Sequence, residues 1–288
     1  MPTFATPTPI DFSINLPVGS IDIVASDRSD TVVTLSPTNP DKAVDRRGVD
    51  ETKVDFDGAR LTITGPKPRL SWIGPTESID VRIELPTASR VTAELAVGPL
   101  HSRGRLGATR IKASTGTVDL DATGDLWLRA SHGSATVDTV DGSAEITADH
   151  GQIRIGTVTG DAILKASHGS ITVGTSGGEL DAKLSYGDFE LTRALDSVRA
   201  TTAYGSIRVL ETSSGSIHLD TGFGAITVGV QSGVPAWLDL SSKEGRVRNE
   251  LDSDAAPAGS ERTVEVRART KFGDITVQRA ARTEGARS

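Results

Sequence analysis

The sequence has no cysteine, no long apolar run and no excess of basic residues, and each absence removes a class of protein. Without cysteine there is no disulfide framework, no thiol nucleophile and no thiolate metal ligand. No segment approaches the ~20 apolar residues that a membrane-spanning helix needs, so we expect no membrane insertion.

The charge balance and the first residues narrow the class further. Lys and Arg total 31 against 38 Asp and Glu, and the net charge of -7 disfavours nucleic acid, whose recognition needs a basic surface. The first residues lack the basic segment and apolar core of a secretory signal, so we expect the protein to be in the cytoplasm.

Glycines recur about every nine residues through the middle of the chain, and this repeat organises the fold. After Gly107, a polar residue follows each glycine, and then every second residue is apolar, as in Ile153 and Ile155 or Ile171 and Val173. Alternation with a period of two predicts short strands with one buried face. The glycines are Gly107, Gly116, Gly124, Gly133, Gly142, Gly151, Gly160, Gly169, Gly178 and Gly187.

Two kinds of nine-residue unit alternate, so the full period is eighteen residues. One kind ends in a flat ring followed by glycine, and the rings at this position are His132, His150, His168, Tyr186, Tyr204 and Phe223. A unit this short cannot bury an apolar face alone, so successive units must stack as coils of a solenoid.

Two known solenoids with short coils fit the spacing poorly. A hexapeptide helix needs an apolar residue every six positions, but from Leu126 that step reaches His132 and Asp138. A calcium-binding roll needs a recurring Gly-Gly-x-Gly-x-Asp, which is missing, so we expect no calcium ladder. We therefore predict an all-β fold, a single elongated parallel β-solenoid flattened into two sheets, with irregular caps at both ends.

The repeat divides the chain into a regular centre and irregular flanks. We predict irregular coils and a cap in residues 1–106, regular coils in 107–233, further coils and a cap in 234–280, and a disordered tail in 281–288. Loops are predicted at 36–53 and 65–77, and no helix is expected. Strands are predicted at 10–16 and 20–35, around a turn at 17–19, and at 54–64, 78–85, 234–251 and 262–277.

The whole pattern resembles a bacterial putative-adhesin family of glycine-punctuated β-strand-repeat proteins, a domain family of unknown function. The resemblance extends from LPVGSIDIVASDRSDTVVTLSP to AWLDLSSKEGRVRNEL and VRARTKFGDITV, and the last two blocks look like a cytosolic branch of that family. The family name implies surface attachment, which the missing export signal does not fit. It implies no catalytic or binding residues that could be transferred to this chain.

The histidines before the turn glycines are the most specific chemical feature. Stacking at eighteen residues places His132, His150 and His168 in one column, with neighbouring coils ~4.8 Å apart. Neutral imidazoles in a row could hold zinc, nickel or copper. The other interpretation is a structural ladder of stacked rings, which the replacement of histidine by Tyr186 and Tyr204 favours.

The remaining candidates concern contacts with other molecules. Trp72, in the loop at 65–77, and the rings Tyr186, Tyr204 and Phe223 are candidate interaction residues. We predict a non-enzymatic scaffold without cofactors, which presents rigid faces to a protein partner or to a second copy. The alternatives are a ligand- or metal-binding module that uses the histidine column and, with weaker support, a carbohydrate-active hydrolase.

Overall fold

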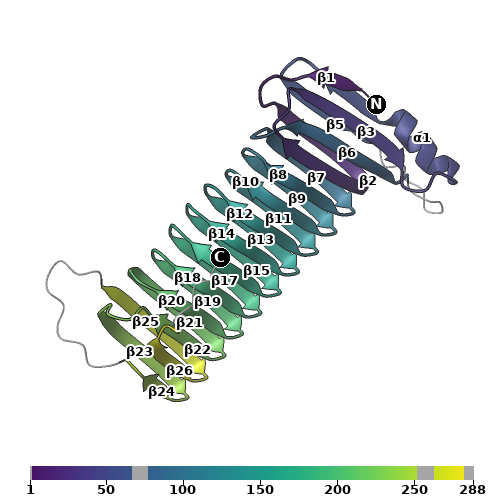
Figure 1. Cartoon of the computed structure of the whole chain (residues 1–288). Coiled ribbons are helices and arrows are strands. Elements are labelled where there is room, and N and C mark those ends of the chain that lie inside the picture. Colours follow the sequence, from purple (N-terminus) through teal and green to yellow (C-terminus); the bar gives the residue numbers. More distant parts are fainter. Residues whose placement is uncertain (1, 67–76, 252–262, 282–288) are drawn as a thin grey trace. The chain divides into compact units, whose positions relative to one another are not determined.

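The computed structural model describes residues 2–66, 77–251 and 263–281, which form two compact units, residues 1–151 and 152–288. Each unit is built of short strands in flattened coils, so the all-β solenoid predicted from the sequence is confirmed (Figure 1). In each unit, the strands that end in a ring-glycine pair and the strands stacked in register with them form one sheet, called here the ladder sheet, and the remaining strands form the opposite sheet.

The first unit contains all of the antiparallel pairs and the one helix of the described residues. Its elements are β1 Thr3–Ala5, β2 Asp11–Ser26, β3 Asp30–Pro37, α1 Ala43–Glu51, β4 Lys53–Phe56, β5 Arg60–Thr64, β6 Ile79–Pro86, β7 Arg90–Val97, β8 Leu100–Arg105, β9 Thr109–Thr115, β10 Val118–Thr123, β11 Leu126–His132, β12 Ala135–Val140 and β13 Ala144–His150.

In the first unit, strand order departs from chain order. The first half of β2 lies between β5 and β7 in the ladder sheet, and its second half lies between β6 and β8 in the opposite sheet. The first coil of the chain is therefore the second coil of the stack. Beyond it, β4 pairs antiparallel with β5, and β3 pairs antiparallel with both β6 and β1.

The helix corrects the prediction that residues 36–53 form a loop and that the chain has no helix. Asp45 is buried, and its carboxylate accepts hydrogen bonds from the N–H of Asn39 (3.1 Å) and of Ser78 (3.1 Å). A Cβ on Gly48 would lie 2.9 Å from the Glu77 Cβ, so glycine lets the helix approach this segment closely. Contacts with distant residues hold this helix in place, rather than an apolar stripe that the sequence could display.

Two predicted strands also need correction. Residues 17–19 are a corner inside the continuous strand β2, and the predicted strand 20–35 is divided between β2 and the antiparallel β3. Arg28, in the connection, forms ion pairs with Asp30 (2.9 Å) and Glu84 (2.5 Å). The predicted strand 54–64 is a hairpin of β4 and β5, turned by Asp57, whose carboxylate accepts from two backbone N–H groups and whose pKa is thereby lowered.

The second unit is a stack of coils whose last members also depart from chain order. Its strands are β14 Ile153–Val158, β15 Ala162–His168, β16 Ile171–Ser176, β17 Leu180–Tyr186, β18 Phe189–Ala194, β19 Val198–Tyr204, β20 Ile207–Thr212, β21 Gly215–Phe223, β22 Ile226–Val230, β23 Ala236–Glu244, β24 Val247–Asn249, β25 Val264–Phe272 and β26 Ile275–Arg279.

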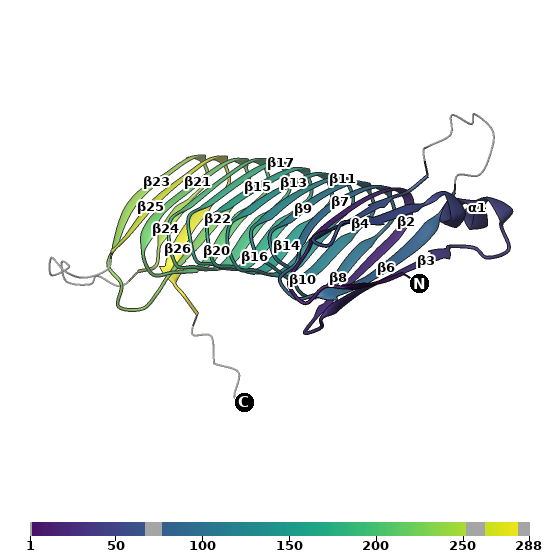
Figure 2. The same ribbon diagram turned by 90° about the horizontal axis from the view of Figure 1, so that it is seen from above.

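The final coil of the chain, β25 and β26, lies inside the stack. In the ladder sheet β25 lies between β21 and β23, and in the opposite sheet β26 lies between β22 and β24 (Figure 2). The coil that precedes it in sequence, β23 and β24, is therefore the outermost one. The expectation that coils stack in chain order is wrong at this end as well.

The core of the second unit is a single layer of inward-facing side chains between the two sheets. Phe189 is fully buried, and the inward residues of neighbouring coils, such as Ile171 and Ile207, are buried with it. Outward residues alternate with them and remain at least partly exposed. Function must therefore be sought on the outward faces, at the turns or at the ends.

Candidate functional site: the ladder groove

The turn glycines of the second unit fix the position of the rings that precede them. Gly205 has φ +150°, and a Cβ there would lie 2.0 Å from the carbonyl oxygen of Gly187 in the neighbouring coil. Only glycine permits this approach of two backbones. The same arrangement at Gly187 and Gly224 keeps the coils in register, so the preceding rings stack.

Five rings form one continuous ladder in the second unit. Their centroids are 5.1 Å apart for His168 and Tyr186, 5.0 Å for Tyr186 and Tyr204, 4.8 Å for Tyr204 and Phe223, and 4.7 Å for Phe223 and Phe272, with planes within 9° of parallel. Tyr186, Tyr204, Phe223 and Phe272 are 43–51% exposed. Each ring covers its neighbours' faces, so mainly ring edges meet the solvent.

A groove runs beside the far end of this ladder. The outward residues just before the rings Tyr204 and Phe223 are small, Ala203 and Gly222, and they line a hollow of about 610 Å³. Rings Tyr204 and Phe223 border it on one side. Its charged lining residues are Lys243, Lys271, Arg269 and Asp220, three cations and one anion. We call this surface the ladder groove.

The structure brings together the predicted interaction residues Tyr186, Tyr204 and Phe223, whereas Trp72 lies outside the described residues. Sequence reasoning left Phe272 out of the ladder, because the coil β23 and β24 interrupts the eighteen-residue spacing between Phe223 and Phe272. The signal that could have found it is the Phe272-Gly273 turn, which repeats the ring-glycine pair. In the outermost coil Glu244 occupies the ring position instead.

The predicted column of histidines has members in both units. In the first unit the His132 and His150 rings stack at 4.9 Å with planes 3° apart, and in the second His168 begins the ladder. Two histidines bind one zinc at about 2.0–2.1 Å, so stacked rings would have to rotate to share it. Among the described residues, no group of three or more His, Cys, Asp or Glu side chains could hold a metal ion. Metal binding by these histidines stays a prediction.

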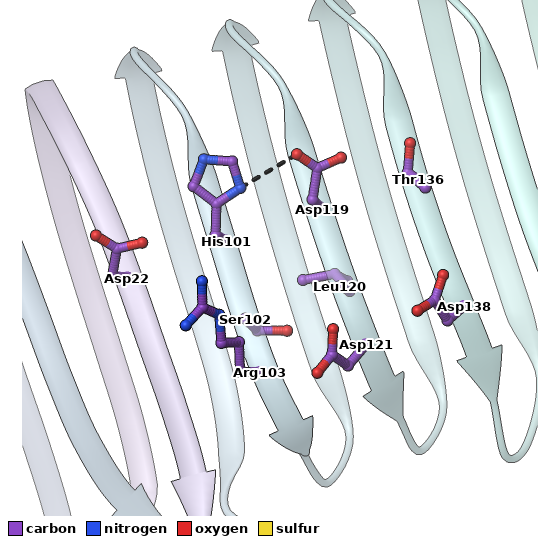
Figure 3. A pocket seen from close by; sticks show the side chains of 9 residues that line it. All are labelled: Asp22, His101, Ser102, Arg103, Asp119, Leu120, Asp121, Thr136 and Asp138. Carbon is purple, nitrogen blue, oxygen red and sulfur yellow. Dashed lines mark ion pairs between the residues drawn. The ribbon is translucent and has the colours of Figure 1, made fainter.

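A second hollow, of about 310 Å³, lies on the opposite sheet of the first unit (Figure 3). His101 Nδ1 lies 3.1 Å from a carboxylate oxygen of Asp119, with Arg103, Asp121 and Asp138 beside them. The nearby Ser102 alternates with these residues and is buried, and the hydroxyl-bearing Thr136 lies beyond Asp119, one strand from it and two strands from His101 (Figure 3). The lining contains no Phe, Tyr or Trp, so it gives a carbohydrate-active hydrolase no support.

No helix in the part of the chain that the structure describes is long and apolar enough to cross a membrane. No curated protein matches the chain. The sequence pattern of a protein family described as Toastrack DUF4097 matches residues 12–278 of the chain.

Several solved structures resemble the chain. A putative adhesin from Bacteroides fragilis is 15% identical with a TM-score of 0.40, and one from Parabacteroides distasonis is 13% identical with a TM-score of 0.38; each match covers 96% of this chain and 95% of the other. A putative lipid binding protein from Parabacteroides distasonis is 11% identical, with a TM-score of 0.34 and the same coverage. At these scores the likeness carries no functional argument.

Proposed function

We propose that this chain, which belongs to the Toastrack DUF4097 family, is a non-enzymatic scaffold that binds a protein partner along the ladder groove. The observation that carries the proposal is the row of exposed rings from Tyr186 to Phe272 beside a groove. A contiguous row of exposed aromatic side chains costs solubility, and such rows mark sites of interaction on soluble proteins.

The electrostatics of the groove indicate the chemistry of its partner. Ring edges carry the positive part of the aromatic quadrupole, and the ladder turns edges toward the solvent. Lys243, Lys271 and Arg269 add three cations, of which Arg269 lies 3.5 Å from Asp239. Edges and cations together favour an extended segment that carries carboxylates, so the proposed partner is an acidic strand-like peptide.

The proposal is tested with a fluorescently labelled peptide of alternating glutamate and threonine, whose binding is followed by anisotropy at low salt. The Tyr204→Ser and Lys271→Glu variants are expected to bind about tenfold more weakly each, since losing one contact of this kind costs about 1–2 kcal/mol. A peptide of alternating lysine and threonine is expected not to bind.

Leu210→Ser is the matched control, because Leu210 is 42% exposed on the opposite sheet of the same unit. It is expected to bind the acidic peptide as the wild type does. The proposal fails if the wild type does not bind the acidic peptide, or if Tyr204→Ser and Leu210→Ser bind it equally well.

A further inference from the structure

The outermost coil of the second unit has a free edge in both sheets. Among the described residues, β23 pairs only with β25, and β24 pairs only with β26. The nine-residue β23 and the three-residue β24 therefore leave the backbone donors and acceptors of about every second residue on the side that faces away from the stack. A free edge of this length is a template for another strand.

The inward side chains of this coil are also poorly covered. Leu238 and Leu240 are only partly buried, and Val247 is 45% exposed. In the next coil the matching residues Val266 and Ala268 are fully buried. The described residues thus leave an apolar end, one coil wide, between two unpaired strand edges.

We propose that two copies of this chain associate through this end, with β23 and β24 of one copy pairing antiparallel with β23 and β24 of the other. A two-fold axis perpendicular to both sheets brings each edge strand opposite its own copy and continues both sheets at once. Leu238, Leu240 and Val247 of the two copies then cover one another. This surface borders the ladder groove at Ser241 and Lys243, but pairing of two copies is a different activity from peptide binding, so the inference goes beyond the proposed function.

The backbone of β23 limits the registers that this pairing can adopt. The Pro235 carbonyl accepts a hydrogen bond from the N–H of Val264 (3.1 Å), so from Pro235 to Ser241 the odd-numbered residues turn their backbone groups toward β25. Leu238 and Leu240 turn theirs to the free side. If the two-fold axis passes beside Ser241, the Ser241 residues of the two copies face each other as a non-hydrogen-bonded pair. The Cα atoms of such a pair lie closer together than those of a hydrogen-bonded pair.

The charges are self-complementary in that register. Asp239 falls opposite Lys243 of the second copy, and the reverse pair forms at the same time. The axis meets the other sheet near Asn249, where Arg248 falls opposite Glu250 of the second copy. Within one copy, Asp239 and Arg248 have only long, exposed ion pairs, at 3.5 Å and 3.9 Å. Opposite charges across an antiparallel pair stabilise it, and like charges oppose it.

Charge-reversal variants test the pairing of β23 between the two copies. The molecular mass of each variant is measured by light scattering across a range of protein concentrations. The wild type is expected to be dimeric and Asp239→Lys monomeric, because like charges would then face each other. The double variant Asp239→Lys, Lys243→Asp restores opposite charges and is expected to be dimeric again. A simple loss of folding could not produce this rescue.

Cross-linking tests the position of the axis, since the chain has no cysteine of its own. Ser241→Cys places two thiols opposite each other and is expected to give a covalent dimer on mild oxidation. Ser29→Cys, at an exposed position in the first unit, is the control and is expected to remain uncross-linked. A wild type that stays monomeric at high concentration overturns the inference, and so does a dimer that survives Asp239→Lys and does not cross-link through Ser241→Cys.

The two proposals fail separately. Tyr204→Ser is expected to remain dimeric while it binds the acidic peptide about tenfold more weakly. A wild type that binds this peptide as a monomer would overturn the end pairing alone.

Discussion

The two ends of the chain finish their coils in different ways. In the first unit the ladder sheet ends at the hairpin of β4 and β5, and the opposite sheet ends at β3 and the three-residue β1. The rings of Phe4 and Phe56 lie 4.7 Å apart, so the two edge strands touch over the end of the core. In the second unit the described residues end in two parallel edge strands with partly exposed leucines.

The difference shows what a solenoid needs beyond its repeat. Val33 and Leu61 are fully buried, because β1 lies outside β3 and β4 lies outside β5. Among the described residues, no such strand lies outside Leu238 and Leu240, which occupy the corresponding kind of position. At a capped end, residues of the same chain bury the apolar side chains and stabilise the fold. At an open end, these side chains become buried only when a partner binds.

The largest expected effect compares one core leucine at each end. Leu61→Ala is expected to lower the free energy of unfolding by about 2–5 kcal/mol, because it leaves a cavity in a closed core. Leu240→Ala, in a half-covered position, is expected to cost about 1 kcal/mol or less. Urea unfolding at low protein concentration measures both. Equal losses would contradict the difference between the ends.

Loss of the helix contacts is expected to make the capped end less stable, and so more like the open end. Asp45→Ala leaves the N–H groups of Asn39 and Ser78 without their acceptor and is expected to destabilise the first unit by about 2–3 kcal/mol. Hydrogen exchange should then rise in α1 and at these two amides. Asp50→Ala, exposed on the same helix, is the control. Unchanged protection in Asp45→Ala would mean that the helix does not depend on this carboxylate.

The smallest expected effect concerns an aspartate clip between coils of the first unit. Asp125 accepts hydrogen bonds from the N–H (2.8 Å) and the hydroxyl (2.9 Å) of Ser143, and these bonds lower the pKa of its carboxyl group. A lowered folded-state pKa adds stability above the unfolded value near 3.8, and this stability is lost as the pH falls through the folded value.

The Asp125→Asn variant is therefore expected to have a slightly lower melting temperature than the wild type at pH 7, with the difference fading below about pH 4. Thermal melts at a series of pH values measure it, with Asp138→Asn as an exposed control. A difference that persists unchanged at low pH would show that the carboxylate charge is not the cause.

The sequence predicts the coils well and their order poorly, for one physical reason. The alternation around Ile171 and Val173 and the ring-glycine pairs at Tyr186 and Tyr204 are local patterns, and they predict strands and a ladder correctly. Every coil offers similar aliphatic residues to its neighbours, so nothing in β2 or β25 specifies which coil will lie beside it. The position of Phe272 was missed for that reason.

The helix and the antiparallel strand β3 could not be read from the pattern either. They depend on single long-range contacts, such as those of Asp45 with Ser78 and of Arg28 with Glu84, which leave no periodic trace. The ladder groove could be predicted from the sequence only in part. Its rings follow from the repeat, but its cations come from β23 and β25, whose neighbours the sequence does not specify.

The interior position of the first and last coils has a consequence for biosynthesis. β2 leaves the ribosome before β5 and β7, but these later strands enclose it from both sides in the ladder sheet. β23 is made before β25, but β25 ends up between β21 and β23. In each unit, strands that are synthesised later therefore lie outside or between strands that are synthesised earlier. The order of synthesis thus differs from the order in the stack near both termini.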